Sequence, residues 1–325
     1  MRFLVAFVAL ASLVLSQPAV ASRPEVGVVH NFGPDLRDSC NFPEGIAADP
    51  TGNVYASSLN FFAGSGPSAK ICVLDRSGVL TRTISVAPGA AGVSRLLGML
   101  FAPSEGLYVL DFADGAYPHG RVLLLDPATG GVRREVDGFA AANAIAKDNA
   151  GNLYVSDSFR GSITRIAPDG AKTETSYGEL LPDGFPPFGA NGVAFDRNER
   201  FLYVPNTSND KVYRIAFDHG SLGAIELFAT GVAGGALDGP DGIAFDVNGN
   251  LYVCSNQSNE VAVLSPDGDV IAEYKGTGDN AFDGSASLVF RGRDLFVTDL
   301  SLFDGGLHQK LSVLTVPHPG APLRP

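Results

Sequence analysis

Cysteine is scarce in this 325-residue chain, which excludes a fold that depends on a framework of disulfides. The three cysteines are Cys40, Cys72 and Cys254, and their spacing matches neither a zinc ribbon nor a Cys-x-x-Cys motif. One pair could form in an oxidising compartment. We interpret the cysteines chiefly as buried free thiols and leave open whether any two of them are bonded.

Positive charge is also in short supply. Lys and Arg together number 23 against 35 for Asp and Glu, which gives a formal net charge of −12 at pH 7. A chain this acidic is a poor partner for nucleic acid or for an anionic membrane surface. Its charge is compatible with a bound cation.

Hydrophobic runs long enough to cross a bilayer are missing. An apolar run from Phe3 to Leu15 is followed by Ala19-Val20-Ala21, the small-x-small pattern of a signal-peptidase site. A membrane anchor is the alternative, but the run is shorter than the ~20 apolar residues that a span needs. We therefore expect residues 1–21 to be a cleaved signal peptide. Residues 22–325 would then form one exported domain, periplasmic or extracellular, monomeric and without a membrane span.

The 3.6-residue period of amphipathic helices is absent, and tryptophan does not occur, whereas glycine (39) and proline (21) are abundant. Instead, one pattern recurs at intervals of roughly 50 residues. It consists of an apolar run, a polar or glycine-containing turn and a second apolar run. Its six copies begin at Phe42 ("FPEGIAADPTGNVYASS"), Leu96 ("LLGMLFAPSEGLYVLDF"), Ala141 ("AANAIAKDNAGNLYVSDS"), Gly189 ("GANGVAFDRNERFLYVPNT"), Gly239 ("GPDGIAFDVNGNLYVCSN") and Ser285 ("SASLVFRGRDLFVTDL").

Each copy is long enough for four short strands. In the copy at Gly239, Gly242–Phe245 and Leu251–Cys254 flank a turn, and the alternating runs "EVAVLSPDG" and "DVIAEYKG" follow. Six such units predict an all-β fold, a six-bladed β-propeller with four antiparallel strands per blade. The last copy lacks a fourth strand, so we expect the N-terminal segment Glu25–Gly33 to supply it and close the last blade.

One position of the repeat changes from copy to copy. It lies in the first strand, which lines the channel of a propeller, so its copies should form a ring: Glu44, Leu97, Asn143, Asn191, Asp241 and Ala286. Four oxygen-bearing side chains with two negative charges suit Ca²⁺ best, with Mg²⁺, Mn²⁺ or Zn²⁺ as alternatives. The competing interpretation is that Asn-Gly and Asp-Gly are turn signals, which Glu44-Gly45 does not fit.

The blade motif and the set Glu44, Asn143, Asn191 and Asp241 resemble the senescence marker protein/regucalcin/gluconolactonase family. Paraoxonases and NHL-repeat propellers are also similar. The resemblance implies a six-bladed propeller with one divalent cation in its channel. It implies that Glu44, Asn191 and Asp241 bind the metal and that Asn143 contacts metal-bound water or substrate. Ala141 departs from the family's sugar-lactone hydrolases, which carry arginine there, and no paraoxonase-like histidine pair lies near the ring.

Long loops between the second and third strands of blades six, one and two should overlook the ring. We expect their side chains to form an apolar lid that binds substrate: Phe61, Phe62, Phe112, Tyr117, His119 and Phe303. The alternatives are loops that pack on one another without a ligand and, for His119, an ordinary surface position.

Two classes of function fit these features. The first is a metal-dependent hydrolase of an apolar lactone or related ester, in which the cation polarises the carbonyl and activates water. Asp241 and Asn143 would be its catalytic residues, with Asp241 taking the proton from water. The second is a non-catalytic NHL-like binding or scaffold propeller. A lyase or strictosidine-synthase-like enzyme on the same fold is a third possibility.

Overall fold

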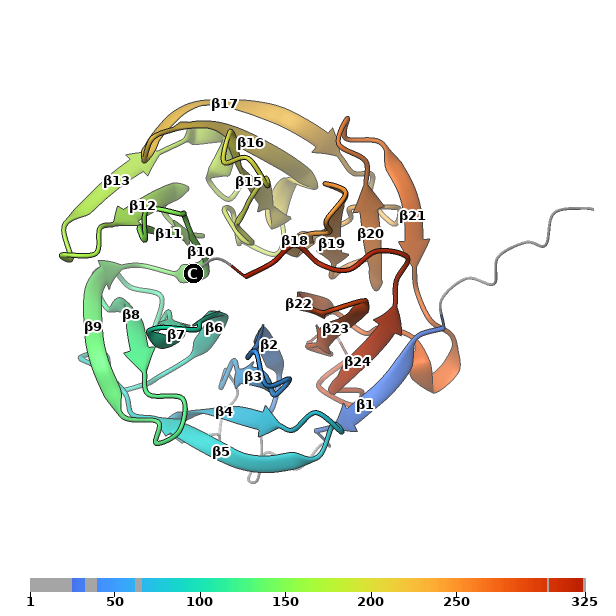
Figure 1. The fold of residues 1–325 in the computed structure, drawn as a ribbon, viewed down its shortest axis with the longest axis horizontal. Helices are drawn as coiled ribbons and strands as arrows, with labels where there is room; N and C mark the ends of the chain where they lie inside the picture. Colours follow the sequence, from blue (N-terminus) through green and yellow to red (C-terminus); the bar gives the residue numbers. More distant parts are fainter. Residues whose placement is uncertain (1–24, 33–39, 62–65, 303, 324–325) are drawn as a thin grey trace, which may run out of the picture.

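The computed structural model describes residues 25–32, 40–61, 66–302 and 304–323, and they form six four-stranded antiparallel sheets arranged around one axis (Figure 1). Helix is limited in these residues to three single 3-10 turns: η1 (Gly178–Leu180), η2 (Thr207–Asn209) and η3 (Gly278–Asn280). The predicted six-bladed propeller is therefore confirmed.

The first three blades are formed by consecutive strands. Blade one comprises β2 (Pro43–Ala48), β3 (Val54–Ser58), β4 (Ala69–Leu74) and β5 (Leu80–Val86). Blade two comprises β6 (Leu96–Ala102), β7 (Gly106–Asp111), β8 (Gly120–Leu125) and β9 (Val132–Phe139). Blade three comprises β10 (Ala142–Lys147), β11 (Leu153–Asp157), β12 (Ser162–Ile166) and β13 (Lys172–Ser176).

The other three blades complete the circle. Blade four comprises β14 (Ala194–Phe195), β15 (Phe201–Asn206), β16 (Lys211–Asp218) and β17 (Ser221–Thr230). Blade five comprises β18 (Pro240–Phe245), β19 (Leu251–Ser255), β20 (Glu260–Leu264) and β21 (Val270–Tyr274). Blade six comprises β22 (Ser285–Arg291), β23 (Asp294–Asp299), β24 (Lys310–Thr315) and β1 (Gly27–Asn31).

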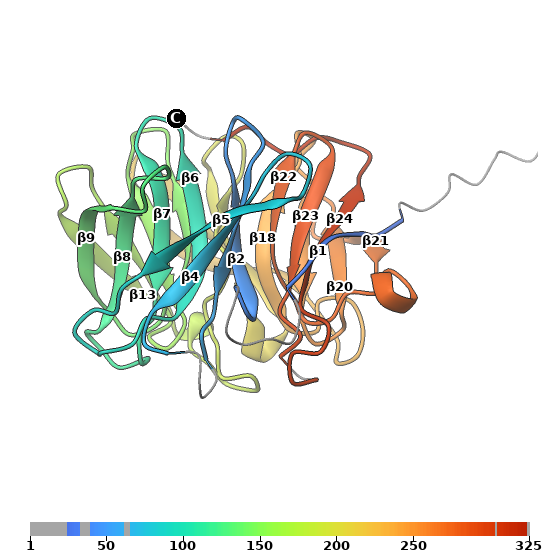
Figure 2. The same cartoon turned by 90° about the horizontal axis from the view of Figure 1, so that it is seen from below.

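The last blade is completed by the N-terminal strand, as predicted. β1 pairs antiparallel with β24, from Gly27 opposite Val313 to Asn31 opposite Lys310. Figure 2 shows the two strands side by side at the rim of the disc. The residues that flank β1, Val26 and Phe32, are buried in two of the hydrophobic cores, so the strand is held by packing as well as by its backbone.

A repeated aspartate shapes the turn between the first two strands of a blade. Asp246 shows its action: Oδ1 accepts hydrogen bonds from the backbone N–H groups of Asn248 and Asn250, at 2.8 and 2.9 Å. The Asn250 amide donates to Oδ2 at 2.8 Å. Both carboxylate oxygens are occupied, so this aspartate has a structural role and is distinct from Asp241 in the same motif.

The cysteines differ from our preferred interpretation. Cys40 and Cys72 form a disulfide with their Cα atoms 5.7 Å apart, and Cys254 is a buried free thiol. Cys40 follows the segment that leads from β1 into blade one, and Cys72 lies in β4 of that blade. The bond therefore joins the chain entering blade one to that blade's own sheet. The spacing of the cysteines could not reveal this pairing, because it depends on how strands distant in sequence pack.

The first strand of each blade is its inner strand and lines the channel. After β24 the chain crosses the mouth of the channel at which these inner strands end (Figure 1, dark red). The backbone N–H of Val247 donates to Pro319 O at 3.0 Å, and the N–H of Ala321 donates to Phe245 O at 2.8 Å. Residues 321–323 line an apolar cavity of ≈ 400 Å³ there, together with side chains from the inner strands of all six blades. This C-terminal tail therefore partly covers that mouth.

The expected signal peptide, residues 1–21, lies outside the described residues. Within the described ranges, no helix is long and apolar enough to cross a membrane.

Candidate metal centre

The predicted ring lies at the mouth of the channel where the inner strands begin. All six members are buried, with exposed fractions of 5% or less: Glu44, Leu97, Asn143, Asn191, Asp241 and Ala286. Five of them are the second residue of an inner strand, and each of these five strands changes register there. In blade one, for example, Pro43 pairs with Ser58, but the next paired residue is Ile46. Such a bulge redirects side chains, and it places the ring residue outside the regular ladder.

Close contacts between blades explain why a small residue follows each ring member. A Cβ added to Gly45 would lie 2.1 Å from the carbonyl oxygen of Leu97, the ring residue of the next blade. A Cβ on Gly192 would lie 2.5 Å from the carbonyl oxygen of Asp241. Neither position has room for a side chain, so the glycines bring the inner strands close enough for the ring side chains to meet.

The four polar ring members line one pocket of ≈ 60 Å³, which is room for a cation with a few water molecules. Asn256 and Thr207 contribute further polar groups to its lining. Its apolar wall consists of residues from blades one, two and six and from the segment before β14: Leu59, Leu97, Pro186, Phe188, Leu300 and Leu302.

Three buried oxygens in this lining have no hydrogen-bond partner: Glu44 Oε2, Asp241 Oδ1 and Asn256 Oδ1. A buried acceptor left without a donor costs about 1–3 kcal/mol. The three residues that carry these oxygens line one small pocket, and two of the oxygens belong to carboxylates. Carboxylate and amide oxygens are the ligands that Ca²⁺ and Mg²⁺ prefer, so the residues present fit a hard divalent cation.

The electrostatics of the pair Glu44 and Asp241 lead to the same inference. Burial raises the pKa of Glu44 well above its ordinary value, and the nearby Asp241 carboxylate raises it further. Burial also raises the pKa of Asp241, to about 7, although hydrogen bonds from Asn256 and Asn191 oppose the increase. Without a cation, the folded protein therefore favours protonated carboxyl groups at this site.

A pH dependence follows for the protein in EDTA. Because both folded-state pKa values are raised, the pair contributes stability that is complete below pH ~4 and is lost as the pH rises through about 7. The melting temperature should fall by about 5 °C or more between pH 5 and pH 8. Scanning calorimetry of the wild type and of Glu44→Gln/Asp241→Asn would measure this. The variant should show a smaller fall, and an identical pH profile for the two proteins would contradict the prediction.

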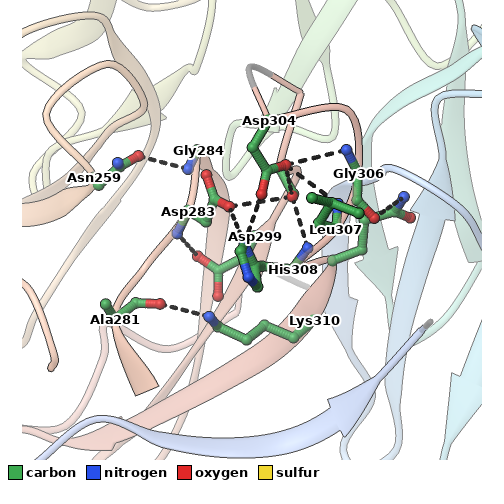
Figure 3. A network of polar contacts seen from close by, with 12 residues as sticks. Asn259, Ala281, Asp283, Gly284, Asp299, Asp304, Gly306, Leu307, His308 and Lys310 are labelled. Atoms are coloured by element: carbon green, nitrogen blue, oxygen red, sulfur yellow. Dashed lines mark hydrogen bonds and ion pairs between the residues drawn. The ribbon is translucent and has the colours of Figure 1, made fainter. Parts of the chain in front are cut away.

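One side of the apolar wall is formed by the loop between β23 and β24, which carries Leu300 and Leu302. Figure 3 shows the polar network of Asp283, Asp304 and His308 that holds this loop. His308 Nδ1 lies 3.1 Å from Asp283 Oδ2 and 2.6 Å from Asp304 Oδ2. The backbone N–H of Leu300 donates to Gly284 O at 2.9 Å. Hydrogen bonds to the two aspartates raise the pKa of His308, which favours the charged form that bridges them. The network fixes the loop to the segment before β22.

The expected lid residues lie elsewhere. Phe61 is 51% exposed, with Arg95 5.3 Å from its ring centre, and Tyr117 is 57% exposed beside Arg160. His119 bonds to Asp114 at 3.0 Å. Phe112 is buried in a hydrophobic core with Leu97. None of these four is among the described residues that line the pocket, and Phe62 and Phe303 lie outside the described residues.

The apolar wall and Asn256 were missed by the sequence analysis, although a signal for part of them exists. Leu59, Thr207, Asn256 and Leu300 each follow the last residue of the second strand of a blade. Aligning the six copies at this second position would have found them, just as alignment at the first position found the ring. Pro186 and Phe188 precede β14 in a segment that is not part of the repeated pattern, so alignment gives no signal for them.

Part of the chain matches a known protein family. Residues 187–300, which contain Asn191 and Asp241, match the family described as the SMP-30/Gluconolactonase/LRE-like region. This part of the chain is therefore similar to the gluconolactonase family. The resemblance inferred from the blade motif and the ring residues is confirmed.

Individual relatives cover different parts of the chain. The pentonolactonase XacC of Haloferax volcanii is 28% identical over 175 residues, which are 51% of this chain and 55% of the relative. This match therefore spans about half the length of that curated relative.

Solved structures share the whole fold. A gluconolactonase from Xanthomonas campestris covers 93% of this chain with a TM-score of 0.63 and 18% identity, and 94% of that protein is matched. A calcium-binding protein, regucalcin, from Agrobacterium tumefaciens covers 92% with a TM-score of 0.61 and 19% identity, and 95% of that protein is matched.

Proposed function

We propose that this protein is an exported, cation-dependent hydrolase of apolar lactones or related esters. The observation that carries the proposal is the convergence of unpartnered buried oxygens from Glu44, Asp241 and Asn256 in the pocket that Asn143 and Asn191 also line. The lactonase activity of the related pentonolactonase supports the reaction class. The calcium-binding regucalcin supports Ca²⁺ as the cation.

A divalent cation at the ring would supply Lewis acidity toward the ester carbonyl and toward water. In the metal-loaded protein Glu44, Asn143, Asn191 and Asp241 would hold it. The carboxylate of Asp241, or that of Glu44, would accept the proton when water adds to the carbonyl carbon. The ring C–O bond of the lactone then breaks, and the proton passes to the departing oxygen to give a hydroxy acid. Asn143 would orient the substrate carbonyl.

The pocket lining supports an apolar acyl group. Its wall is made of leucine, proline and phenylalanine side chains, while the polar groups are confined to the ring and to its immediate neighbours. Position 141, where the resemblance to sugar-lactone hydrolases calls for arginine, is a fully buried alanine in a hydrophobic core. A polyhydroxylated substrate would therefore leave its hydroxyl groups without partners along this wall, which is costly.

The disulfide between Cys40 and Cys72 supports export, because disulfides persist in oxidising compartments. The expected signal peptide supports the same location.

The test is hydrolysis of medium-chain γ- and δ-lactones, aryl esters and glucono-1,5-lactone in Ca²⁺ and in EDTA. We expect turnover in Ca²⁺, loss of it in EDTA, and kcat/KM for the apolar lactones at least about tenfold above that for the sugar lactone. Equal turnover in EDTA would exclude the cation-dependent reaction. Binding of these lactones without turnover would favour the non-catalytic binding propeller.

A further inference from the structure

A second ring of residues lies directly beside the first. In every blade, the residue after the last residue of the second strand donates its backbone N–H to the carbonyl two positions before the ring residue, at 2.9–3.3 Å. The same bond recurs six times, so these residues are structurally equivalent: Leu59, Phe112, Ser158, Thr207, Asn256 and Leu300.

The second ring matches the first in character in every blade except blade one, where apolar Leu59 accompanies Glu44. Its apolar members pack with the apolar members of the first ring in a single hydrophobic core, which contains Leu59, Leu97, Phe112, Ala286 and Leu300. Its polar members each bond to the polar ring residue of their own blade. Asn143 Nδ2 donates to Ser158 Oγ at 2.9 Å, Asn191 Nδ2 donates to Thr207 Oγ1 at 2.8 Å, and Asn256 Nδ2 donates to Asp241 Oδ2 at 3.0 Å.

The two hydroxyl groups determine the orientation of the ring amides. Ser158 Oγ donates its only proton to Ala190 O at 2.6 Å, and Thr207 Oγ1 donates its proton to Pro240 O at 2.8 Å. A hydroxyl has one donor, so each can only accept from the amide beside it. The NH₂ end of the amide must therefore face the hydroxyl. The oxygen ends of Asn143 and Asn191 are directed away from it.

Asn256 has the corresponding effect on Asp241. When the Asp241 carboxylate is ionised, as it would be beside a cation, it only accepts hydrogen bonds, so the Asn256 amide presents its nitrogen and occupies Asp241 Oδ2. Asp241 Oδ1 is left as the oxygen without a partner. The Asn256 backbone also donates to Gly239 O at 2.9 Å. Gly239 must stay small, because a Cβ there would lie 2.4 Å from Asn256 Oδ1.

We propose that Ser158, Thr207 and Asn256 are positioning residues that direct one oxygen each of Asn143, Asn191 and Asp241 to the cation. This inference rests on the cation site proposed above. Residues that orient metal ligands in this way typically contribute 10–100-fold to metal affinity. The second ring therefore extends the site from four side chains to seven.

The test is calcium binding by isothermal titration calorimetry to the wild type, Thr207→Val, Ser158→Ala and Asn256→Leu. Each variant should bind Ca²⁺ about 10–100-fold more weakly than the wild type. Thr207→Ser, which restores the hydroxyl, should return the dissociation constant to within about threefold. The Ca²⁺-induced shift in melting temperature provides a second readout, and it shows in the same experiment that each variant is folded.

Ser285→Ala is the matched control. Its hydroxyl is also buried between two blades, where it donates to Glu260 O at 2.8 Å, but it bonds to no ring side chain. Ser285→Ala should lower the melting temperature by the same amount in Ca²⁺ and in EDTA. It should bind Ca²⁺ like the wild type. Wild-type-like affinity in all three variants would overturn the positioning role while leaving the cation site intact. A wild type that binds no divalent cation would overturn both proposals.

Discussion

Asp241→Asn is expected to remove most of the response of this protein to calcium. In the wild type, EDTA should lower the melting temperature and Ca²⁺ should restore it, because the unfolded chain cannot bring residues of four blades together around an ion. At a concentration one hundred times the dissociation constant, a ligand stabilises by about 2.7 kcal/mol, which corresponds to about 5 °C or more for a domain of this size. The variant loses one of two negative charges that bind the cation, so this shift should nearly vanish.

The same substitution should reduce lactone hydrolysis on the order of 100-fold or more, since several kcal/mol of barrier lowering depend on the cation. Asp246→Asn is the matched control, because Asp246 is a buried aspartate of the same motif whose oxygens serve the turn. It should lower the melting temperature but keep the calcium shift. Calorimetry with and without Ca²⁺ measures both. A full calcium response in Asp241→Asn would remove Asp241 from the site.

Deletion of residues 25–32 is expected to be still more damaging to the fold. It would expose the edge of β24 and remove the buried side chains of Val26 and Phe32. Burial of two such side chains is worth about 3–6 kcal/mol, and the lost backbone hydrogen bonds add to this. The total is comparable with the whole stability of a typical domain, about 5–15 kcal/mol.

The truncated chain should therefore melt far earlier or associate through its open edge, which thermal melting and size-exclusion chromatography would detect. A chain that begins at residue 25 is the control, because it keeps β1 complete. Equal melting temperatures and elution volumes for the two chains would show that β1 does not close the ring.

The fold and the first ring could be predicted from the sequence because both recur in every copy of the repeat. Period-2 alternation and recurring turns are local signals, and Asp246 and its bonds to Asn248 and Asn250 form within five residues of chain. Glu44 and Asp241 could be aligned because each precedes a glycine that close packing requires. At these positions the repeated sequence pattern and the close packing of the fold involve the same residues.

The loop residues of the pocket wall and the disulfide could not be predicted in this way. The loops after the second strands differ in length, and their aromatic residues are apolar enough to suggest a lid. Tyr117 and Phe61 instead pack beside the cationic side chains of Arg160 and Arg95. Leu302 lines the pocket from a loop that is held by a network of Asp283, Asp304 and His308. Such contacts depend on three-dimensional proximity and have no period in the sequence.

The C-terminal tail affects how small molecules can enter and leave the channel. It partly covers one mouth of the channel, and the ring lies at the other mouth. No described residue lines both cavities. In the proposed reaction, lactone and product would therefore both use the mouth at the ring. The hydroxy acid product would compete with the lactone for this mouth and for the site behind it. Accumulated product should therefore slow turnover competitively, by raising the apparent KM and leaving kcat unchanged.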